Sequence, residues 1–72
     1  MKGLVCGRIV NFVDENYNNH PAMVTRIHNE ENGTVNLDVV IDSVTAINHV
    51  ARFSMSFSDG NEPCTWNWMP KE

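Results

Sequence analysis

The feature that most restricts the fold of this chain is an alternation of apolar and polar residues with a period of two. In residues 34–41 the apolar side chains of one face are Val35, Leu37, Val39 and Ile41. Residues 49–57 repeat the pattern, and the face predicted to be apolar carries Ala51, Phe53, Met55 and Phe57, whereas the other carries Val50, Arg52, Ser54 and Ser56. Successive side chains of a strand point to opposite sides of the sheet, so both segments are predicted to be half-buried strands.

Turn-forming residues separate these segments from other β-rich ones. Three further strands are predicted, at residues 4–13, 22–28 and 65–68. Asn32-Gly33 between two such segments is a strong hairpin signal. No window has a helical period of 3.6 residues over two turns. We therefore predict an all-β protein: a small antiparallel barrel, SH3-like or OB-like, of four to six short strands, with residues 1–72 forming a single domain.

Length and charge narrow the possible partners. A chain of 72 residues buries only about 60% of its unfolded surface, so we expect a thin core and a homo-oligomer that shares interfaces. Nine Asp and Glu outnumber five Lys and Arg, giving a net charge of −4, which makes duplex nucleic acid an unlikely partner. The sequence has no apolar run near ~18 residues and no signal-peptide core. We expect a soluble protein with no membrane partner, located in the cytoplasm.

The spacing of the reactive residues predicts no enzyme. The sequence has no Cys-x-x-Cys, no His-Glu-x-x-His and no glycine-rich phosphate loop, so no catalytic residues, no metal and no cofactor are expected. Cys6 and Cys64 are either small semi-buried thiols or, if the first and last strands are neighbours, a disulfide. The acidic loop at residues 14–19 is either a mobile lid over a site or an ordinary surface loop.

Both tryptophans lie close together near the C-terminus. On a strand, Trp66 and Trp68 face the same side, and Thr65 and Asn67 face the other. The two indoles are either the plug of a small core or a platform on which a ligand ring stacks, with Thr65 and Asn67 as polar groups beside it.

Three arginines lie within predicted strands. Arg8, Arg26 and Arg52 either occupy a solvated outer face or converge on a cationic pocket for a phosphate group. With the tryptophans they complete the set of candidate ligand-binding residues.

Several short motifs resemble a known family. These are Gly7-Arg8-Ile9-Val10, Pro21-Ala22-Met23-Val24-Thr25, Val35-Asn36-Leu37 and Thr65-Trp66-Asn67-Trp68-Met69-Pro70. In this order and spacing they resemble very small phage and prophage proteins whose members end in a T-W-H-W-P-E motif. Asn67 stands where the family has histidine, and Met69 precedes the proline. The resemblance implies phage origin and a compact β fold in the host cytoplasm. It also implies similarity to small anti-defence proteins, called sponges, that sequester nucleotide immune signals.

Two functional hypotheses follow. The first is a phage sponge that binds a cyclic dinucleotide or a cyclic ADP-ribose isomer without catalysis, using indole stacking and arginine–phosphate contacts. The alternative is a protein-interaction module that inhibits or tethers a host or phage protein through its aromatic patch. A third possibility, binding of single-stranded nucleic acid, is disfavoured by the acidic charge.

Overall fold

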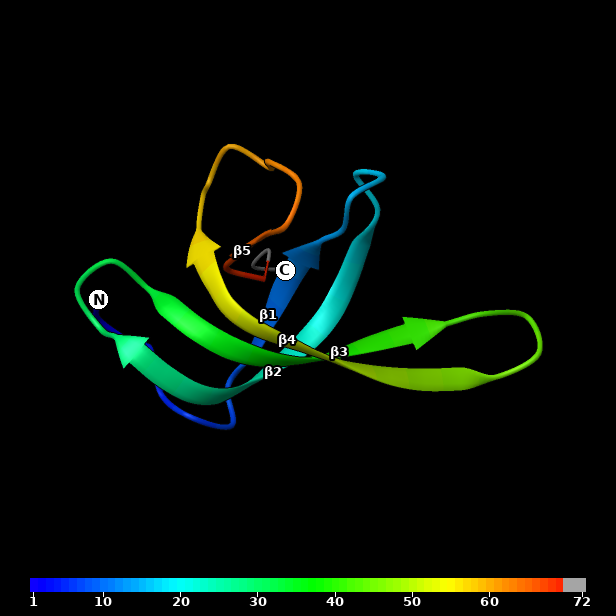
Figure 1. Ribbon diagram of the computed structural model, residues 1–72, viewed down its shortest axis with the longest axis horizontal. Coiled ribbons are helices and arrows are strands. Elements are labelled where there is room, and N and C mark those ends of the chain that lie inside the picture. The colour runs from blue at the N-terminus through cyan, green and yellow to red at the C-terminus, as the bar shows by residue number, and fades with distance from the viewer. Residues whose placement is uncertain (70–72) are drawn as a thin grey trace.

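Five strands follow one another around a closed barrel in the computed structural model, which describes residues 1–69 (Figure 1). The strands are β1 (Ile9–Val13), β2 (Asn19–Asn29), β3 (Thr34–Asp42), β4 (Ile47–Phe57) and β5 (Thr65–Asn67). The β1–β2, β2–β3 and β3–β4 pairs are antiparallel, and β5 also pairs antiparallel with β1. The β4–β5 pair, which completes the ring, is parallel. The predicted small all-β barrel is thus confirmed, with one parallel pair in an otherwise antiparallel sheet.

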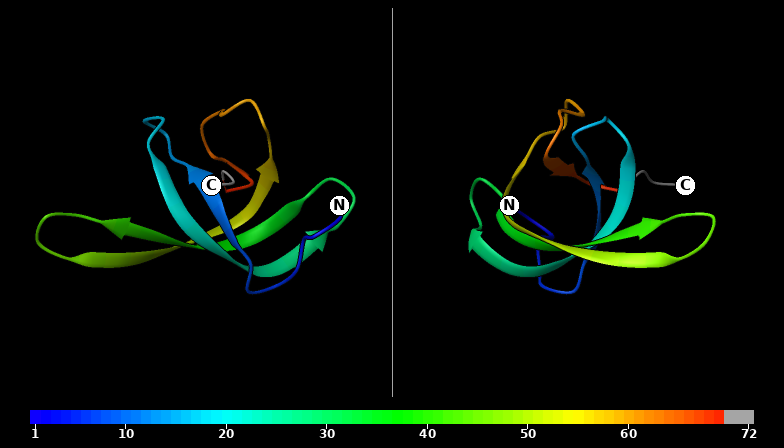
Figure 2. Two further views of the ribbon diagram at one scale, coloured as in Figure 1. Left: turned by 180° about the vertical axis from the view of Figure 1, so that it is seen from behind. Right: turned by 45° about the vertical axis from the view of Figure 1, so that its right-hand side comes forward.

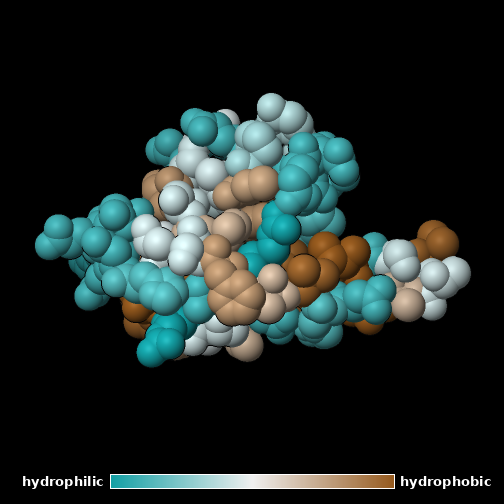
Figure 3. Space-filling view, viewed as in Figure 1, coloured by the Kyte–Doolittle hydropathy of each residue, from teal (hydrophilic) through white to brown (hydrophobic). Residues whose placement is uncertain are grey.

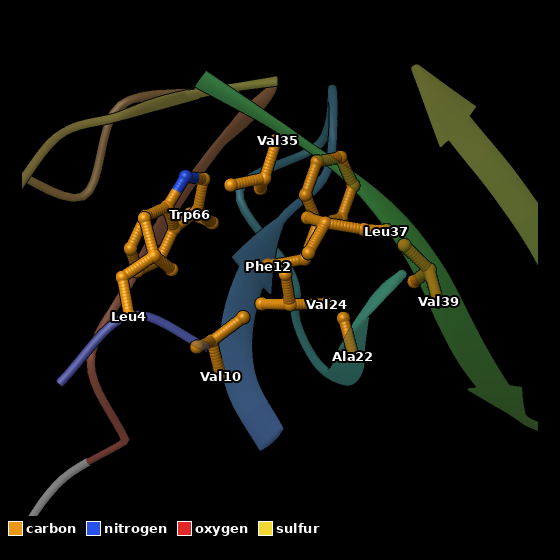
Figure 4. Packing of buried hydrophobic residues seen from close by; sticks show 9 residues of the cluster. All are labelled: Leu4, Val10, Phe12, Ala22, Val24, Val35, Leu37, Val39 and Trp66. Atoms are coloured by element: carbon orange, nitrogen blue, oxygen red, sulfur yellow. The ribbon is translucent and has the colours of Figure 1, made fainter. Parts of the chain in front are cut away.

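The inward-facing side chains of the strands form one core. Its buried members are Leu4, Val10, Phe12, Ala22, Val24, Val35, Leu37, Val39 and Trp66. Figure 4 shows these side chains converging from β1, β2, β3, β5 and, for Leu4, the segment before β1. The period of two in β3 accounts for its contribution, because alternate residues are buried from Val35 to Val39.

The predicted faces of β4 are wrong in part, because a bulge interrupts the strand. Leu37 pairs with Arg52 and Val35 with Met55, so two residues of β4 lie opposite Asn36 alone. One of them, Ser54, has a φ of 54°, and its backbone N–H donates to Asn36 Oδ1 at 2.9 Å. The extra residue reverses the alternation. Phe53 consequently faces solvent with 67% exposure, whereas Arg52 lies on the same side of the sheet as buried Leu37.

The β2–β3 turn is packed tightly against the core at Gly33. This residue has a φ of 76°, and its carbonyl accepts a hydrogen bond from Trp66 Nε1 at 2.7 Å. A Cβ at this position would lie 2.9 Å from Phe57 Cβ and 3.1 Å from the Trp66 ring. Only glycine satisfies both the backbone conformation and the packing.

The far end of the β3–β4 hairpin leaves the barrel. The β2–β3 pairing ends at Ala22 and Val39, but β3 and β4 stay paired as far as Asp42 and Ile47. Figure 2 shows this part, residues 40–49, projecting as a two-stranded extension, which we call the arm. The molecule therefore measures 38 × 25 × 22 Å. The described residues include no helix that is long and apolar enough to cross a membrane.

Candidate functional site

A pocket of about 160 Å³ lies between the β1–β2 turn and the base of the arm. Its apolar walls are Phe12, Val39, Ile41 and Val50, and the charged groups that border it are Asp14, Glu15 and Arg52. We call this the Arg52 pocket. In Figure 3 hydrophobic residues gather where the arm meets the barrel. The pocket therefore combines an apolar interior with a charged rim, a combination typical of small-molecule sites.

Arg52 is the cation of this pocket, and the β4 bulge places it there. Its guanidinium carbon lies 5.1 Å from the centre of the Phe12 ring, within the range of a cation–π contact. Nη2 donates to the Glu15 carboxylate and lies 3.8 Å from Cys64 Sγ. Nε is buried and has no hydrogen-bond partner among residues 1–69. One edge of the guanidinium is thus only partly satisfied.

The β1–β2 turn supplies the two carboxylates. Asp14 Oδ2 is 2.7 Å from His20 Nε2, and Oδ1 accepts the backbone N–H groups of Asn16 and Asn18. The His20 contact, followed by the backbone bonds, lowers the pKa of Asp14 below its ordinary value. Asp14 therefore acts mainly as a structural cap of the turn.

Glu15 is held differently, by a side chain across the pocket. Hydrogen bonding to Arg52 is the largest cause that lowers the pKa of Glu15. The Glu15 side chain is 59% exposed, whereas that of Arg52 is 28% exposed. The contact is thus an ion pair at the pocket rim with one partly buried and one mostly solvated partner.

The structure places the two tryptophans in different environments. Trp66 is fully buried, and its only polar atom donates to Gly33. Trp68 is half-buried and meets Trp66 edge to face at 5.1 Å between ring centres. The two indoles do lie together, as the period of two predicts, but Trp66 offers no face to a ligand.

The polar residues beside the tryptophans are occupied by structural hydrogen bonds. Thr65 Oγ1 donates to the carbonyl of Glu62 at 2.7 Å. Asn67 accepts from Asn11 Nδ2 at 3.2 Å and donates to Asn61 Oδ1 at 3.3 Å. Both side chains therefore help to fix β5 and the preceding loop.

The three arginines are not brought together in the pocket. Arg8 lies over the Trp68 ring, 5.1 Å from its centre. Arg26 is exposed on β2. Only Arg52 lines the Arg52 pocket. A cationic pocket built from all three is absent from the described part of the chain.

The two cysteines are not paired with each other. Cys6 is exposed and Cys64 partly buried, and both are free thiols. Within residues 1–69, no group of three or more His, Cys, Asp or Glu residues is arranged to hold a metal ion.

Sequence reasoning missed the pocket residues other than Arg52. Phe12 and Val39 carry the signal of core residues only, and Glu15 that of a polar loop. The one available hint was the possibility that the acidic loop covers a site. In the structure Asp14 and Glu15 border the pocket.

Comparison with known proteins gives no relative: no protein-family model, no curated protein and no solved structure matches this chain. The resemblance to phage proteins consequently stays a prediction.

Proposed function

We propose that this protein is a non-enzymatic interaction module that binds another protein through the β3–β4 arm. The observation that carries the proposal is the exposure of apolar side chains on a two-stranded extension. Val44 at the tip is fully exposed and Ile47 is 63% exposed, and Val50, at the base of the arm, is 42% exposed. An isolated two-stranded ribbon is only marginally stable in water, so contact with a partner would stabilise the arm as well as bury these residues.

The two faces of the arm indicate how it would bind. Val50 shares a face with Ile41 and the Arg52 pocket, whereas Ile47 pairs with Asp42 on the opposite face. Because apolar groups lie on both faces and at the tip, insertion into a groove buries more of them than contact with a flat surface. The carboxylates of Asp38 and Asp42, with the net charge of −4, favour a groove with a basic rim.

Site-specific cross-linking tests this function. A photoreactive phenylalanine analogue at Val44 should give one discrete adduct in cells, and the captured protein should then bind the purified chain. Ile47→Asp should weaken that purified interaction by at least about tenfold, the loss of about 1.4 kcal/mol from an interface. Val5→Asp is the control, since Val5 is 57% exposed outside the arm. A cross-linked dimer of this chain would identify a second copy as the partner. Equal binding by the Ile47 and Val5 variants would refute the arm as the interface.

A second candidate function is sequestration of a nucleotide-derived signal, the phage-sponge hypothesis. Its support is the Arg52 pocket, where a guanidinium lies over the Phe12 ring beside apolar walls; at about 160 Å³ this pocket has room for one ring or one phosphate group of such a ligand and not for the whole molecule. Burial of Trp66 removes one of the two proposed stacking surfaces. Thermal shift against cyclic dinucleotides and cyclic ADP-ribose isomers tests it. A ligand that raises Tm and is recovered unchanged supports a sponge, and the absence of any shift across the panel contradicts it.

A further inference from the structure

We propose that the Arg52 pocket is a binding site for a small organic anion, and that Glu15 occupies the anion position until the ligand displaces it. The ligand class is a carboxylate or a phosphate monoester attached to a compact apolar body. The proposal concerns a small-molecule site that shares Ile41 and Val50 with the arm and its base, but it does not require a protein partner. It also does not require the ligand to be a nucleotide.

One edge of the Arg52 guanidinium is suited to an anion with two oxygens. The Nε–H and one Nη2–H of an arginine point along the same edge, which matches the two oxygens of a carboxylate or phosphate. In this protein Glu15 contacts Nη2 only, and the buried Nε has no partner among the residues described. A buried N–H without an acceptor destabilises the folded protein. An anion that accepts from both nitrogens would remove this cost, and Glu15 in its present position does not.

Glu15 is easily displaced from Arg52. Its side chain is 59% exposed, and it lies in a turn in which Tyr17 has a φ of 64°. An exposed carboxylate regains most of its hydration when it leaves an ion pair, so such pairs contribute little net stability. Asp14, in contrast, is fixed by His20 and two backbone N–H groups. The turn therefore has one fixed and one exchangeable carboxylate.

The walls and volume of the pocket restrict the kind of ligand that fits. Phe12 lies under the guanidinium, and Val39, Ile41 and Val50 form the remaining apolar wall. A volume of about 160 Å³ is below the ~300–1,000 Å³ of pockets for drug-sized ligands, so it suits a single ring or a short branched chain. Asp14 at the rim disfavours several negative charges. A small molecule with one anionic group fits best.

Displacement has a measurable consequence. If Glu15 occupies the guanidinium edge nine-tenths of the time, the apparent affinity for the ligand is about tenfold weaker than that of the open pocket. Glu15→Gln leaves a neutral, weaker competitor and should recover much of that factor. If no anion binds at the guanidinium edge, removal of the Glu15 charge gives no such gain.

The test is a titration of the ¹⁵N-labelled protein with benzoate and, separately, with phenyl phosphate. The backbone amide resonances of Phe12 and Val50, which line the pocket, are followed in every variant, and in the proteins that keep Arg52 its Nε–H resonance is followed as well. We expect saturable shifts of these resonances, binding up to about tenfold tighter for Glu15→Gln, and loss of binding for Arg52→Lys, which lacks the planar edge. The control is Glu31→Gln, which removes the same charge from the exposed β2–β3 turn and should bind like the unaltered protein.

Each outcome decides the proposal. Response to benzoate alone identifies a carboxylate ligand, response to phenyl phosphate alone identifies a phosphate monoester, and either one supports the site. The proposal is overturned if neither probe moves the Arg52 resonance, or if Glu15→Gln binds no more tightly than Glu31→Gln. Should Arg52→Lys fail to fold, the comparison of the two glutamate variants still decides. Failure here leaves the cross-linking test of the arm unaffected.

Discussion

Trp66 and Phe12 are partners in the β1–β5 pairing, yet they lie in opposite environments. Trp66 packs against Phe57 at 5.0 Å, against Trp68 and against Gly33, and its N–H is hydrogen-bonded. We call this region the Trp66 side. Phe12 is also buried, but it is covered by Arg52, a cation with an unsatisfied nitrogen, next to an open pocket.

The Trp66 side has the features of a region that stabilises the barrel, whereas the Arg52 pocket has those of a region that binds a ligand. The indole N–H of Trp66 has a hydrogen-bond partner, and a Cβ at Gly33 has no room. The Arg52 pocket keeps both space and an unsatisfied donor, two features that reduce stability and favour a ligand. In Figures 1 and 2 the β2–β3 turn of the Trp66 side and the arm beside the pocket lie on opposite sides of the molecule.

The largest expected effect comes from removing the plug of the Trp66 side. Trp66→Ala should lower the free energy of unfolding by about 3–5 kcal/mol, as much as a domain of this size usually has. Trp68→Ala should cost only about 1–2 kcal/mol, since part of its surface is already in water. Urea denaturation followed by circular dichroism measures both. Equal losses for the two variants would contradict the assignment of Trp66, and not Trp68, as the buried plug of the core.

Gly33→Ala should have the next largest effect. The alanine would adopt an unfavourable positive φ and press on Phe57 and Trp66, at a cost of about 1–3 kcal/mol. Gly60→Ala is the matched control, because a Cβ there lies 3.6 Å or more from its nearest neighbours and should leave stability nearly unchanged. The same denaturation experiment would disprove the packing argument if both variants unfolded at one urea concentration.

Acid should lower the stability of the protein by protonating the two carboxylates of the β1–β2 turn. The pKa values of Asp14 and Glu15 in the folded protein lie below the ordinary values of 3.8 and 4.5. Their contribution to stability is therefore complete above about pH 4.5 and is lost as the pH falls through the lower, folded-state values. Urea midpoints measured between pH 7 and pH 2 should decline over this range, and less steeply in Asp14→Asn. A midpoint that rose on acidification would have the wrong sign.

Arg52→Met should change stability least. The substitution removes a partly exposed ion pair, worth about 0–1 kcal/mol, and also removes the unsatisfied buried Nε, which costs about as much or more. We expect the free energy of unfolding of Arg52→Met, measured by urea denaturation, to lie within about 1 kcal/mol of that of the unaltered protein. A loss above about 2 kcal/mol would show that Arg52 stabilises the barrel and would weaken its assignment to binding.

Much of the barrel could be predicted from sequence because it depends on local patterns. The alternation in β3, from Val35 to Val39, determines which residues are buried. Asn32-Gly33 fixes the hairpin between β2 and β3. The spacing of Trp66 and Trp68 brings the indoles together. Each of these follows from strand geometry alone.

The bulge in β4 could not be predicted, and it determines the site. Ser54 takes a positive φ without being glycine, so no residue in the sequence indicates the extra position. The alternating pattern predicts Phe53 on the core side of the sheet and Arg52 on the other side. Because of the bulge, Phe53 is exposed and Arg52 lies on the same side as buried Leu37. Of the seven predicted binding residues, only Arg52 lines the pocket. The other lining residues, such as Phe12 and Glu15, were not predicted, because their role depends on contacts between segments that are distant in the sequence.

The closure of the barrel by β5 has a consequence for the order of folding. This strand has three residues, and the side chains that join it to β1, Asn11 and Asn67, are 56 positions apart. The β2–β3 and β3–β4 hairpins form from neighbouring segments, so their loop-closure entropy is smaller. We therefore expect the three-stranded meander to form first and the ring to close last. In hydrogen exchange, amides of β5 should open by local separation of its short pairings, well before those of β3.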